Sequence, residues 1–435
     1  MDIRDVNRLL YEGKTDAAGL LPHLEALKEL RYVFEPDFGL KELPEQPGLL
    51  LIRGPRQYGK STWLEAQIKK TVTAFGGGSA FYLNGDEVKD SEELLTQMDR
   101  LIPLYANNVR VKRLFIDEIT AVEGWEIVFK RLFDQGKLKD ILIVSTGSKA
   151  TDLRRGSERL PGRKGKLARN NYLFTPISFR EFQSRCGSVF ESKTLTAYLL
   201  SGGCPIACNE IAVHGKISEY LTVMIRDWMY GECLATGRNR SSLLGVLEIL
   251  IKTAGIPLGQ TRLAREAGLA NNTVAAGYVE LLGDLLTVAP CYAWDASRKI
   301  AVRRKPAKFH FINVLAALAW HPARIASLDD FENLKAEEKA KFYEWLVAQE
   351  LWRRAAIRGE EIPEELFFWK SDKHELDFAA APRHFIEVKT GASNPLEFSW
   401  FPKIFPHGIL EVINPQVFES GPIRGLRMED FLRQS

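Results

Sequence analysis

The stretch Gly48-Leu-Leu-Leu-Ile-Arg-Gly-Pro-Arg-Gln-Tyr-Gly-Lys-Ser61 decides the fold of the first half of the chain. Its apolar start, Gly48–Ile52, is strand-sized and stops at Gly54-Pro55, as expected for a buried parallel strand. Residues 54–61 fit the spacing G-x4-G-K-[S/T], and a helical pattern then runs to a group of three glycines. A strand, a glycine-bounded loop and a helix in this order predict a phosphate-binding loop.

Each residue type in this loop has a physical role in holding a nucleoside triphosphate. Backbone N–H groups and the positive end of the helix dipole favour phosphate. Lys60 is predicted to place a catalytic cation between the β- and γ-phosphates, and the Ser61 hydroxyl is a hard ligand for Mg²⁺. We therefore predict ATP and Mg²⁺ as cofactors, bound by Gly54, Pro55, Arg56, Gln57, Tyr58, Gly59, Lys60, Ser61 and Thr62.

Polar side chains also follow two later strands of the same region. The mostly apolar strand Arg113–Ile116 runs into Asp117-Glu118, and ligands of parallel sheets bind at the carboxyl ends of the strands. We expect Asp117 to hold the Mg²⁺ shell and Glu118 to act as the base or orienter for the attacking water. Thr146 and Ser148 follow the next strand and are predicted to contact the γ-phosphate or this water, with simple capping as the alternative.

Strand-like and helical segments alternate over residues 48–145, which is typical of a parallel α/β sheet. One strand candidate, Ser79–Leu83, stands in sequence between the phosphate-loop strand and the strand that precedes Asp117. This order favours the subclass of P-loop proteins with an extra strand inserted between the two motif strands.

The composition excludes several other classes of protein. The 435 residues have 59 Lys and Arg against 56 Asp and Glu, a net charge of +3, so the chain is not a general polycation. Five Cys residues make no disulfide framework, and Cys204-x3-Cys208 near His214 lacks a fourth zinc ligand, so buried free thiols are expected. The start lacks the pattern of a signal peptide and no apolar run is membrane-sized, which predicts a cytoplasmic protein without a membrane partner.

Several motifs in combination resemble a known family. They are GPRQYGKST (54–62), LFIDEITAVEGW (114–125), VSTGS (144–148), PISFREF (176–182), YLLSGG-P (198–205), FHFINVLAA (309–317), LVAQEL (346–351) and ELDF…IEVK (375–389). Over about residues 45–435 the chain resembles archaeal and bacterial AAA-type ATPases whose C-terminal half contains a domain long catalogued as of unknown function. The resemblance implies nucleotide hydrolysis. Gln57-Tyr58 departs from the family's usual Arg and small residue, but both lie at free loop positions.

These observations together predict an α/β multidomain protein. The expected parts are an N-terminal segment (1–47), a P-loop AAA-type ATPase core with a parallel sheet (48–185), a helical lid (186–238), a winged helix-turn-helix (239–325) and an α+β domain like that of PD-(D/E)xK restriction endonucleases (326–435).

Two short segments concentrate positive charge. Residues 154–169 contain seven basic residues and one acid, and the family's Gly-Arg pair is matched there by Gly162-Arg163. An Arg163 that reaches a neighbour's γ-phosphate would imply a homo-oligomer. Contact with a nucleic-acid backbone and a merely solvated loop are the alternatives.

The second basic segment follows a predicted helix-turn-helix, residues 258–286, and a strand that forms a possible wing. Its six basic residues have no acid between them, which suggests DNA as a partner, although winged helices also dock proteins. The six are Arg298, Lys299, Arg303, Arg304, Lys305 and Lys308.

The last part of the chain contains a set of acids beside a lysine. Glu387 and Lys389 share a face of one strand, and Asp377 on the preceding strand is expected to join them. Two carboxylates bind a hard divalent cation, Mg²⁺ or Mn²⁺, and Lys389 is placed to activate water. The arrangement resembles the PD-(D/E)xK fold, in which Glu350 matches an accessory acid and metal ligand on the first helix. Asp377, Glu387 and Lys389 are thus candidate catalytic residues for DNA cleavage.

The main hypothesis from the sequence is an Mg²⁺-dependent ATPase that is coupled to DNA binding and to metal-dependent DNA cleavage. The alternative is a nucleotide-controlled switch or scaffold of defence or signalling type, whose C-terminal domain binds without cutting.

Overall fold

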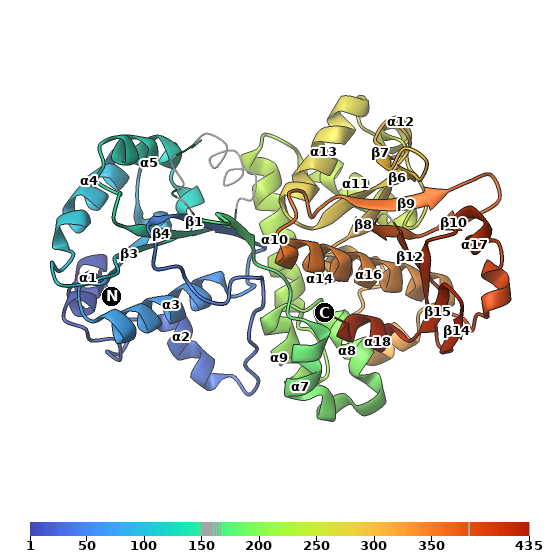
Figure 1. The fold of residues 1–435 in the computed structure, drawn as a ribbon, viewed down its shortest axis with the longest axis horizontal. Helices are drawn as coiled ribbons and strands as arrows, with labels where there is room; N and C mark the ends of the chain where they lie inside the picture. Colours follow the sequence, from blue (N-terminus) through green and yellow to red (C-terminus); the bar gives the residue numbers. More distant parts are fainter. Residues whose placement is uncertain (149–159, 161, 163–164, 166, 382, 435) are drawn as a thin grey trace. The chain divides into compact units, whose positions relative to one another are not determined.

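The computed structural model describes residues 1–148, 160, 162, 165, 167–381 and 383–434. The chain forms two compact units (Figure 1). Unit 1 comprises residues 1–33 and 37–175, and unit 2 comprises residues 34–36 and 176–435.

Unit 1 is built on a five-stranded sheet with the order β2-β3-β4-β1-β5, in which every pairing is parallel. Because β4 lies between β1 and β3, the prediction of a strand inserted between the two motif strands is confirmed. The strands are β1 (Gly48–Arg53), β2 (Ala80–Asn84), β3 (Arg113–Asp117), β4 (Leu142–Gly147) and β5 (Asn171–Leu173).

Apolar strand residues such as Leu49, Leu114 and Ile143 form one buried core with the helices of unit 1. The helix α3 (Lys60–Phe75) follows Gly59, whose φ is 93°, and ends before Gly76, whose φ is 87°, so both flanking positions favour a residue without a Cβ atom. The helices are α1 (Ile3–Tyr11), α2 (Pro22–Ala26), α3 (Lys60–Phe75), α4 (Ser91–Leu101) and α5 (Trp125–Asp134).

Unit 2 begins with helices and continues with two sheets. Its helices are α7 (Phe179–Phe190), α8 (Thr194–Ser201), α9 (Pro205–His214), α10 (Glu219–Ala235), α11 (Arg240–Lys252), α12 (Gln260–Glu266), α13 (Asn272–Asp284), α14 (Val314–Trp320), α15 (Leu328–Glu332), α16 (Ala336–Arg358), α17 (Phe401–Ile404) and α18 (Met428–Arg433).

The helices α11, α12 and α13 occupy the segment predicted to hold a helix-turn-helix. The turn between α12 and α13 contains Gly268 with a φ of 67°, and the Asn271 side chain caps α13 by accepting a hydrogen bond from the Val274 N–H. An antiparallel hairpin of β6 (Val288–Asp295) and β7 (Ile300–Val302) follows, and β8 (Lys308–Phe311) pairs with the other end of β6.

The strand β6 also pairs in parallel with β9 (Leu366–Lys370), so one sheet with the order β10-β9-β6-β7 spans the domain boundary expected at residue 325. A second sheet has the order β11-β12-β13-β15-β14. The remaining strands are β10 (Glu375–Leu376), β11 (Phe378–Ala381), β12 (His384–Val388), β13 (Ile409–Ile413), β14 (Phe418–Ser420) and β15 (Ile423–Leu426).

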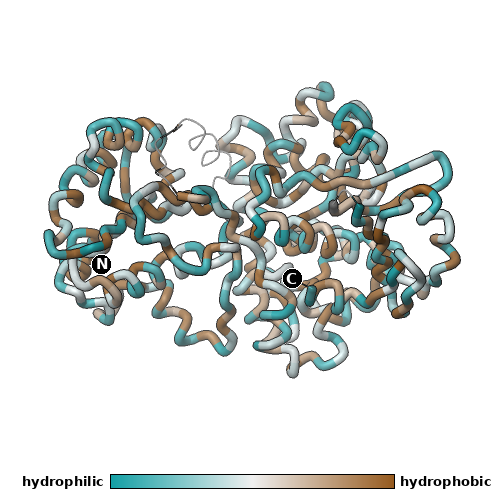
Figure 2. Tube along the Cα trace, viewed as in Figure 1, coloured by the Kyte–Doolittle hydropathy of each residue, from teal (hydrophilic) through white to brown (hydrophobic). Residues whose placement is uncertain are grey.

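Hydrophobic and hydrophilic residues are interspersed along both units (Figure 2). Among the described residues, no helix is both long and apolar enough to cross a membrane. The five cysteines are free and buried.

Candidate nucleotide site and carboxylate cluster

The loop between β1 and α3 has the backbone that phosphate binding requires. Gln57 and Gly59 have φ values of 65° and 93°, and a Cβ atom on Gly54 would lie 2.6 Å from the Cβ atom of Phe174. No side chain caps the amino end of α3, so its first N–H groups remain directed at the loop. Gly54, Pro55 and Tyr58 are buried, and Arg56 and Gln57 are exposed.

The Lys60 ammonium lies inside this loop. Its Nζ atom donates hydrogen bonds of 2.8 Å to the carbonyl oxygens of Gly54 and Pro55. Burial lowers the pKa of Lys60, while the charges of Glu118 and Asp117 act in the opposite direction. The loop and the acidic end of β3 thus lie within electrostatic range at the same edge of the sheet, where the carboxyl ends of β1, β4 and β3 meet.

Thr146 joins the ends of β3 and β4. Its Oγ1 atom donates a hydrogen bond to Asp117 Oδ1 and accepts one of 3.0 Å from the Glu118 N–H. Asp117 is only 8% exposed. The hydroxyl therefore orients the carboxylate that was predicted to hold the Mg²⁺ shell.

Glu118 adopts a left-handed backbone, with a φ of 48°, directly after β3. Its Oε1 atom accepts hydrogen bonds from the Thr120 hydroxyl at 2.7 Å, the Ser148 N–H at 2.7 Å and the Ser148 hydroxyl at 2.8 Å. Burial raises the pKa of Glu118, but the Lys60 charge and these hydrogen bonds outweigh burial, so its pKa is lowered. A carboxylate kept ionised is suited to act as a base or to orient water.

The N-terminal segment supplies an ion pair that the sequence did not indicate. His23 Nδ1 lies 2.7 Å from Glu65 Oε1, and the Leu24 N–H donates to Glu65 Oε2 at 2.8 Å. The hydrogen bond from Glu65 raises the pKa of His23 above its ordinary value, and the charge of Asp117 adds to this effect. The helix α2 thus packs on α3 within electrostatic range of Asp117.

Three of the four predicted C-terminal residues are brought together in unit 2. The Asp377 N–H donates to Glu387 Oε2 at 3.2 Å, and the Val388 N–H donates to Asp377 Oδ2 at 3.0 Å. Lys389 Nζ lies 2.6 Å from Glu387 Oε1. The four acids Asp377, Glu387, Glu344 and Glu375 are called the carboxylate cluster below.

Glu350, predicted as the accessory metal ligand, lies in another environment. Its buried carboxylate accepts hydrogen bonds from Arg353 Nε at 2.8 Å and Arg354 Nε at 2.7 Å. Glu344, six residues earlier on α16, is the acid within electrostatic range of Asp377 and Glu387. Six residues turn a helix by about 240°, so Glu344 and Glu350 face different neighbours.

Burial and repulsion leave two acids of the cluster only weakly acidic. Burial, reinforced by the charge of Asp377, raises the pKa of Glu344 to about 8 and that of Glu387 to about 7. The Glu344 Oε2 atom is buried and has no hydrogen-bond partner among the described residues. The cluster therefore retains protons near neutral pH.

Lys308, which the sequence placed in the basic segment, is instead buried inside unit 2 with a side chain only 1% exposed. Its Nζ atom lies 2.7 Å from Glu375 Oε1 and 3.2 Å from Asp377 Oδ1. Burial alone would lower the pKa of Lys308, but the two carboxylates raise it overall. Lys308 is therefore an internal counter-ion and is withdrawn from any surface that binds DNA.

Within the described residues, no group of three or more His, Cys, Asp or Glu side chains has the arrangement of a metal site. Asp377 and Glu387 remain the pair that would hold a divalent cation. Arg163 and most of the first basic segment lie outside the described residues. Arg169, which is described, lies over the Tyr172 ring at 4.2 Å.

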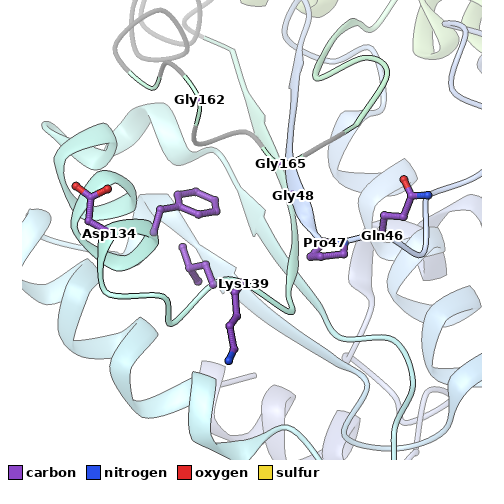
Figure 3. A pocket seen from close by; sticks show the side chains of 9 residues that line it. Gln46, Pro47, Gly48, Asp134, Lys139, Gly162 and Gly165 are labelled. Atoms are coloured by element: carbon purple, nitrogen blue, oxygen red, sulfur yellow. The ribbon is translucent and has the colours of Figure 1, made fainter.

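A cavity of about 750 Å³ lies beside the amino ends of β1 and β4 (Figure 3). The phosphate loop follows the opposite, carboxyl end of β1. Its lining includes Pro47, Gly48, Phe133 and Lys139. None of the predicted site residues lines it, so the nucleotide site and this cavity are distinct.

Comparisons with known proteins agree with the geometry of unit 1. Residues 46–183 match the family model described as an AAA domain. The chain is 23% identical over 378 residues to the uncharacterized protein MJ1544 of Methanocaldococcus jannaschii, covering 82% of this chain and 77% of that protein. It is 22% identical over 331 residues to the uncharacterized protein MJ1637 of the same organism, covering 68% of each.

Two solved structures show a more distant similarity. The Walker-type ATPase PABY2304 of Pyrococcus abyssi has a TM-score of 0.45 and 14% identity, covering 69% of this chain and 94% of that one. The Orc1 protein of Aeropyrum pernix, solved in complex with DNA, has a TM-score of 0.33 and 12% identity, covering 73% and 96%.

The parallel sheet, the phosphate loop and the acidic end of β3 define a P-loop nucleotide-binding domain in unit 1. The match of residues 46–183 to the AAA domain supports a more particular class, the AAA-type P-loop ATPases.

Proposed function

We propose that this protein is an Mg²⁺-dependent ATPase whose hydrolysis is coupled to DNA binding by unit 2. The observation that carries the ATPase part is the convergence of Lys60, Asp117 and Glu118 on one edge of a parallel sheet, joined by the Thr146 and Ser148 hydrogen bonds. The uncapped amino end of α3 fits phosphate, and Ser61 with Asp117 provides oxygen ligands of the kind that Mg²⁺ prefers.

Bound Mg²⁺ would neutralise phosphate charge and fix the geometry of the triphosphate. Lys60 would stabilise the charge that develops as the γ-phosphoryl group departs, and Glu118 would orient water and accept its proton. The lowered pKa of Glu118 keeps this base ionised at neutral pH. A homo-oligomer in which Arg163 completes a neighbouring site is part of the proposal.

We propose that α11–α13 and the β6–β7 hairpin form a winged helix that binds DNA. Lys299 lies in the hairpin, and Arg304 and Lys305 follow β7; all three are exposed and form no ion pair with the described residues. Exposed cations at a hairpin favour contact with phosphate backbone. The five-part division of the chain predicted above is part of this proposal, with the winged helix and the C-terminal part joined by the sheet that spans residue 325.

Metal-dependent DNA cleavage by the carboxylate cluster is a second candidate function. It is favoured by the hydrogen-bonded placement of Asp377, Glu387 and Lys389, which suits a divalent cation beside a lysine. The position of Lys308 argues against cleavage, because its ammonium group already neutralises the Asp377 carboxylate that would bind the metal. A nucleotide-controlled protein that binds DNA without cutting is the alternative that this ion pair supports.

The test of the ATPase and its coupling is phosphate release by the full chain with Mg²⁺, in the presence and absence of DNA. Lys60→Ala is expected to abolish turnover, whereas Lys70→Ala, an exposed lysine on the same helix, leaves it unchanged. DNA is expected to change the rate in the wild-type protein. Equal turnover in Lys60→Ala and Lys70→Ala contradicts the ATPase, and an absence of DNA binding at low salt contradicts the coupling.

Cleavage is tested separately with duplex, branched and single-stranded DNA in Mg²⁺ or Mn²⁺. If the cluster cuts, the wild type degrades at least one substrate and Lys389→Ala does not. Intact DNA under all these conditions removes the cleavage candidate and leaves the DNA-coupled ATPase standing.

A further inference from the structure

The parallel pairing of β6 with β9 gathers aromatic side chains on one face of their sheet. Tyr292 of β6 is in register with Phe367 of β9. Two residues further along each strand, on the same face, lie Trp294 and Trp369. These four residues are called the aromatic face. The opposite face, which contains Cys291 and Phe368, is buried.

The aromatic face holds one tilted pair of rings, and two further rings extend it beside Trp369. Trp294 and Phe367 have ring centroids 5.4 Å apart with an angle of 53° between the ring planes. Trp369 stacks on Trp400 at 5.8 Å, and Trp400 stacks on His374 at 4.1 Å with an angle of 8° between the ring planes. Trp369 is buried in a core with Phe398 and Phe401. Trp294, Phe367 and Trp400 pack against this core and are, like His374, partly exposed. Partly exposed flat rings offer surfaces on which further rings can stack.

Positive charge borders the aromatic face along both edges of the sheet. At the β7 edge, the Arg303 guanidinium lies 5.7 Å from the centre of the Tyr292 ring, near the exposed Lys299, Arg304 and Lys305. At the β10 edge, Lys373 is exposed in the turn that precedes His374.

Most nearby acids are already neutralised. Asp295 pairs with Arg298, Glu365 with Arg303, and Glu375 with Lys370 and Lys308. Asp372 is exposed beside Lys373 and offsets that charge. The positive balance is therefore strongest at the β7 edge, where three cations without ion-pair partners lie beside the aromatic face.

We propose that this surface binds single-stranded DNA, with bases stacked on Trp294 and on the His374–Trp400 pair and with phosphates held by the cations of the β7 edge. The inference rests on the proposed DNA-binding function and specifies its substrate class. A single strand is favoured over a duplex because only unpaired, unstacked bases expose their ring faces to a protein. Stacking accepts any base, so the expected binding is tolerant of sequence.

The experiment measures the affinity of the full chain for a fluorescein-labelled oligo-dT and for a labelled duplex, by anisotropy at low salt without divalent metal. Trp294→Leu is expected to weaken oligo-dT binding about tenfold, because one stacked base contributes a factor of this order. Trp294→Phe retains a ring and is expected to stay within about threefold of the wild type. Tyr220→Ala, which removes an exposed ring from α10, is the matched control and is expected to bind as the wild type does.

Three results separate this inference from the function on which it rests. Selective loss of oligo-dT binding in Trp294→Leu, with rescue in Trp294→Phe and unchanged duplex binding, supports it. Wild-type affinity in Trp294→Leu, or equal losses in the Leu and Phe variants, overturns it while duplex binding keeps the proposed function intact. A wild-type protein that binds neither DNA overturns both.

Discussion

Replacing Lys308 with methionine removes a buried positive charge and leaves a side chain of similar length. The Lys308 side chain is 1% exposed, and its partners Glu375 and Asp377 are 30% and 14% exposed. Removal of one member of a buried ion pair typically costs about 3–5 kcal/mol, since the other charge is left without compensation. Because the partners are partly exposed, we expect a loss of about 3 kcal/mol, more than a hundredfold in the unfolding equilibrium.

Lys370→Met is the matched control for this change. Lys370 Nζ lies 2.6 Å from the other oxygen of Glu375, but its side chain is 53% exposed, so water replaces the lost interaction. Exposed pairs contribute about 0–1 kcal/mol, and we expect a loss in that range. Two lysines on one carboxylate thus differ mainly in burial.

Urea unfolding followed by tryptophan fluorescence measures both variants, because seven of the nine tryptophans lie in unit 2. The free-energy change of this transition is taken from its midpoint and slope. The deficit of Lys308→Met is expected to shrink as the pH falls, because carboxyl groups that have lost their cation bind protons more tightly in the folded than in the unfolded chain. Equal losses in the two variants, or a deficit that does not change with pH, would refute the assignment of Lys308 as an internal counter-ion.

Three further predictions concern single acids and their partners. Glu118→Gln is expected to keep ATP binding but to lose turnover at least about a hundredfold, checked by equilibrium binding and phosphate release; wild-type turnover removes Glu118 from the reaction. Ser148→Ala removes a hydrogen bond that lowers the pKa of Glu118, so the acid limb of the kcat–pH profile is expected to move to higher pH, and an unmoved limb contradicts this role. Burial raises the pKa of Glu344 to about 8, so the folded wild type binds a proton that the unfolded chain releases and loses stability as the pH rises towards 8. Glu344→Gln is expected to reduce this loss in thermal unfolding at pH 6 and pH 9, with Glu387 accounting for the remainder, and parallel behaviour of the two proteins argues against it.

The parallel sheet of unit 1 was predictable because its strands are continuous apolar runs that carry their own motifs. β1, β2 and β3 lie within one residue of the predicted ranges at either end. β5 was not predicted, since its three residues form a strand only through pairing with β1. Short edge strands depend on tertiary contacts that leave little trace in local sequence.

The candidate sites show a similar limit. The phosphate loop and the acids of β3 are contiguous in sequence, so spacing alone located them. The choice between Glu344 and Glu350 depends on the rotation of α16 against its neighbours, which a helical pattern with acids on two faces does not specify. Lys308 belonged by composition to a basic run, and only the folded structure shows that it is buried, with its Nζ atom between Glu375 and Asp377.

The hydrogen bonds between β6 and β9 have a mechanical consequence. β6 forms the basic hairpin with β7, whereas β9 leads, through its turn, to Glu375 in β10 and to Asp377, which directly follows β10. A force on the hairpin acts on β9 along the strand direction, so all the hydrogen bonds between β6 and β9 resist it together. A fragment that ends before β9 would leave β6 with an unpaired edge, which invites aggregation. The hairpin and the acids therefore behave as one mechanical unit, and a truncated protein must keep both.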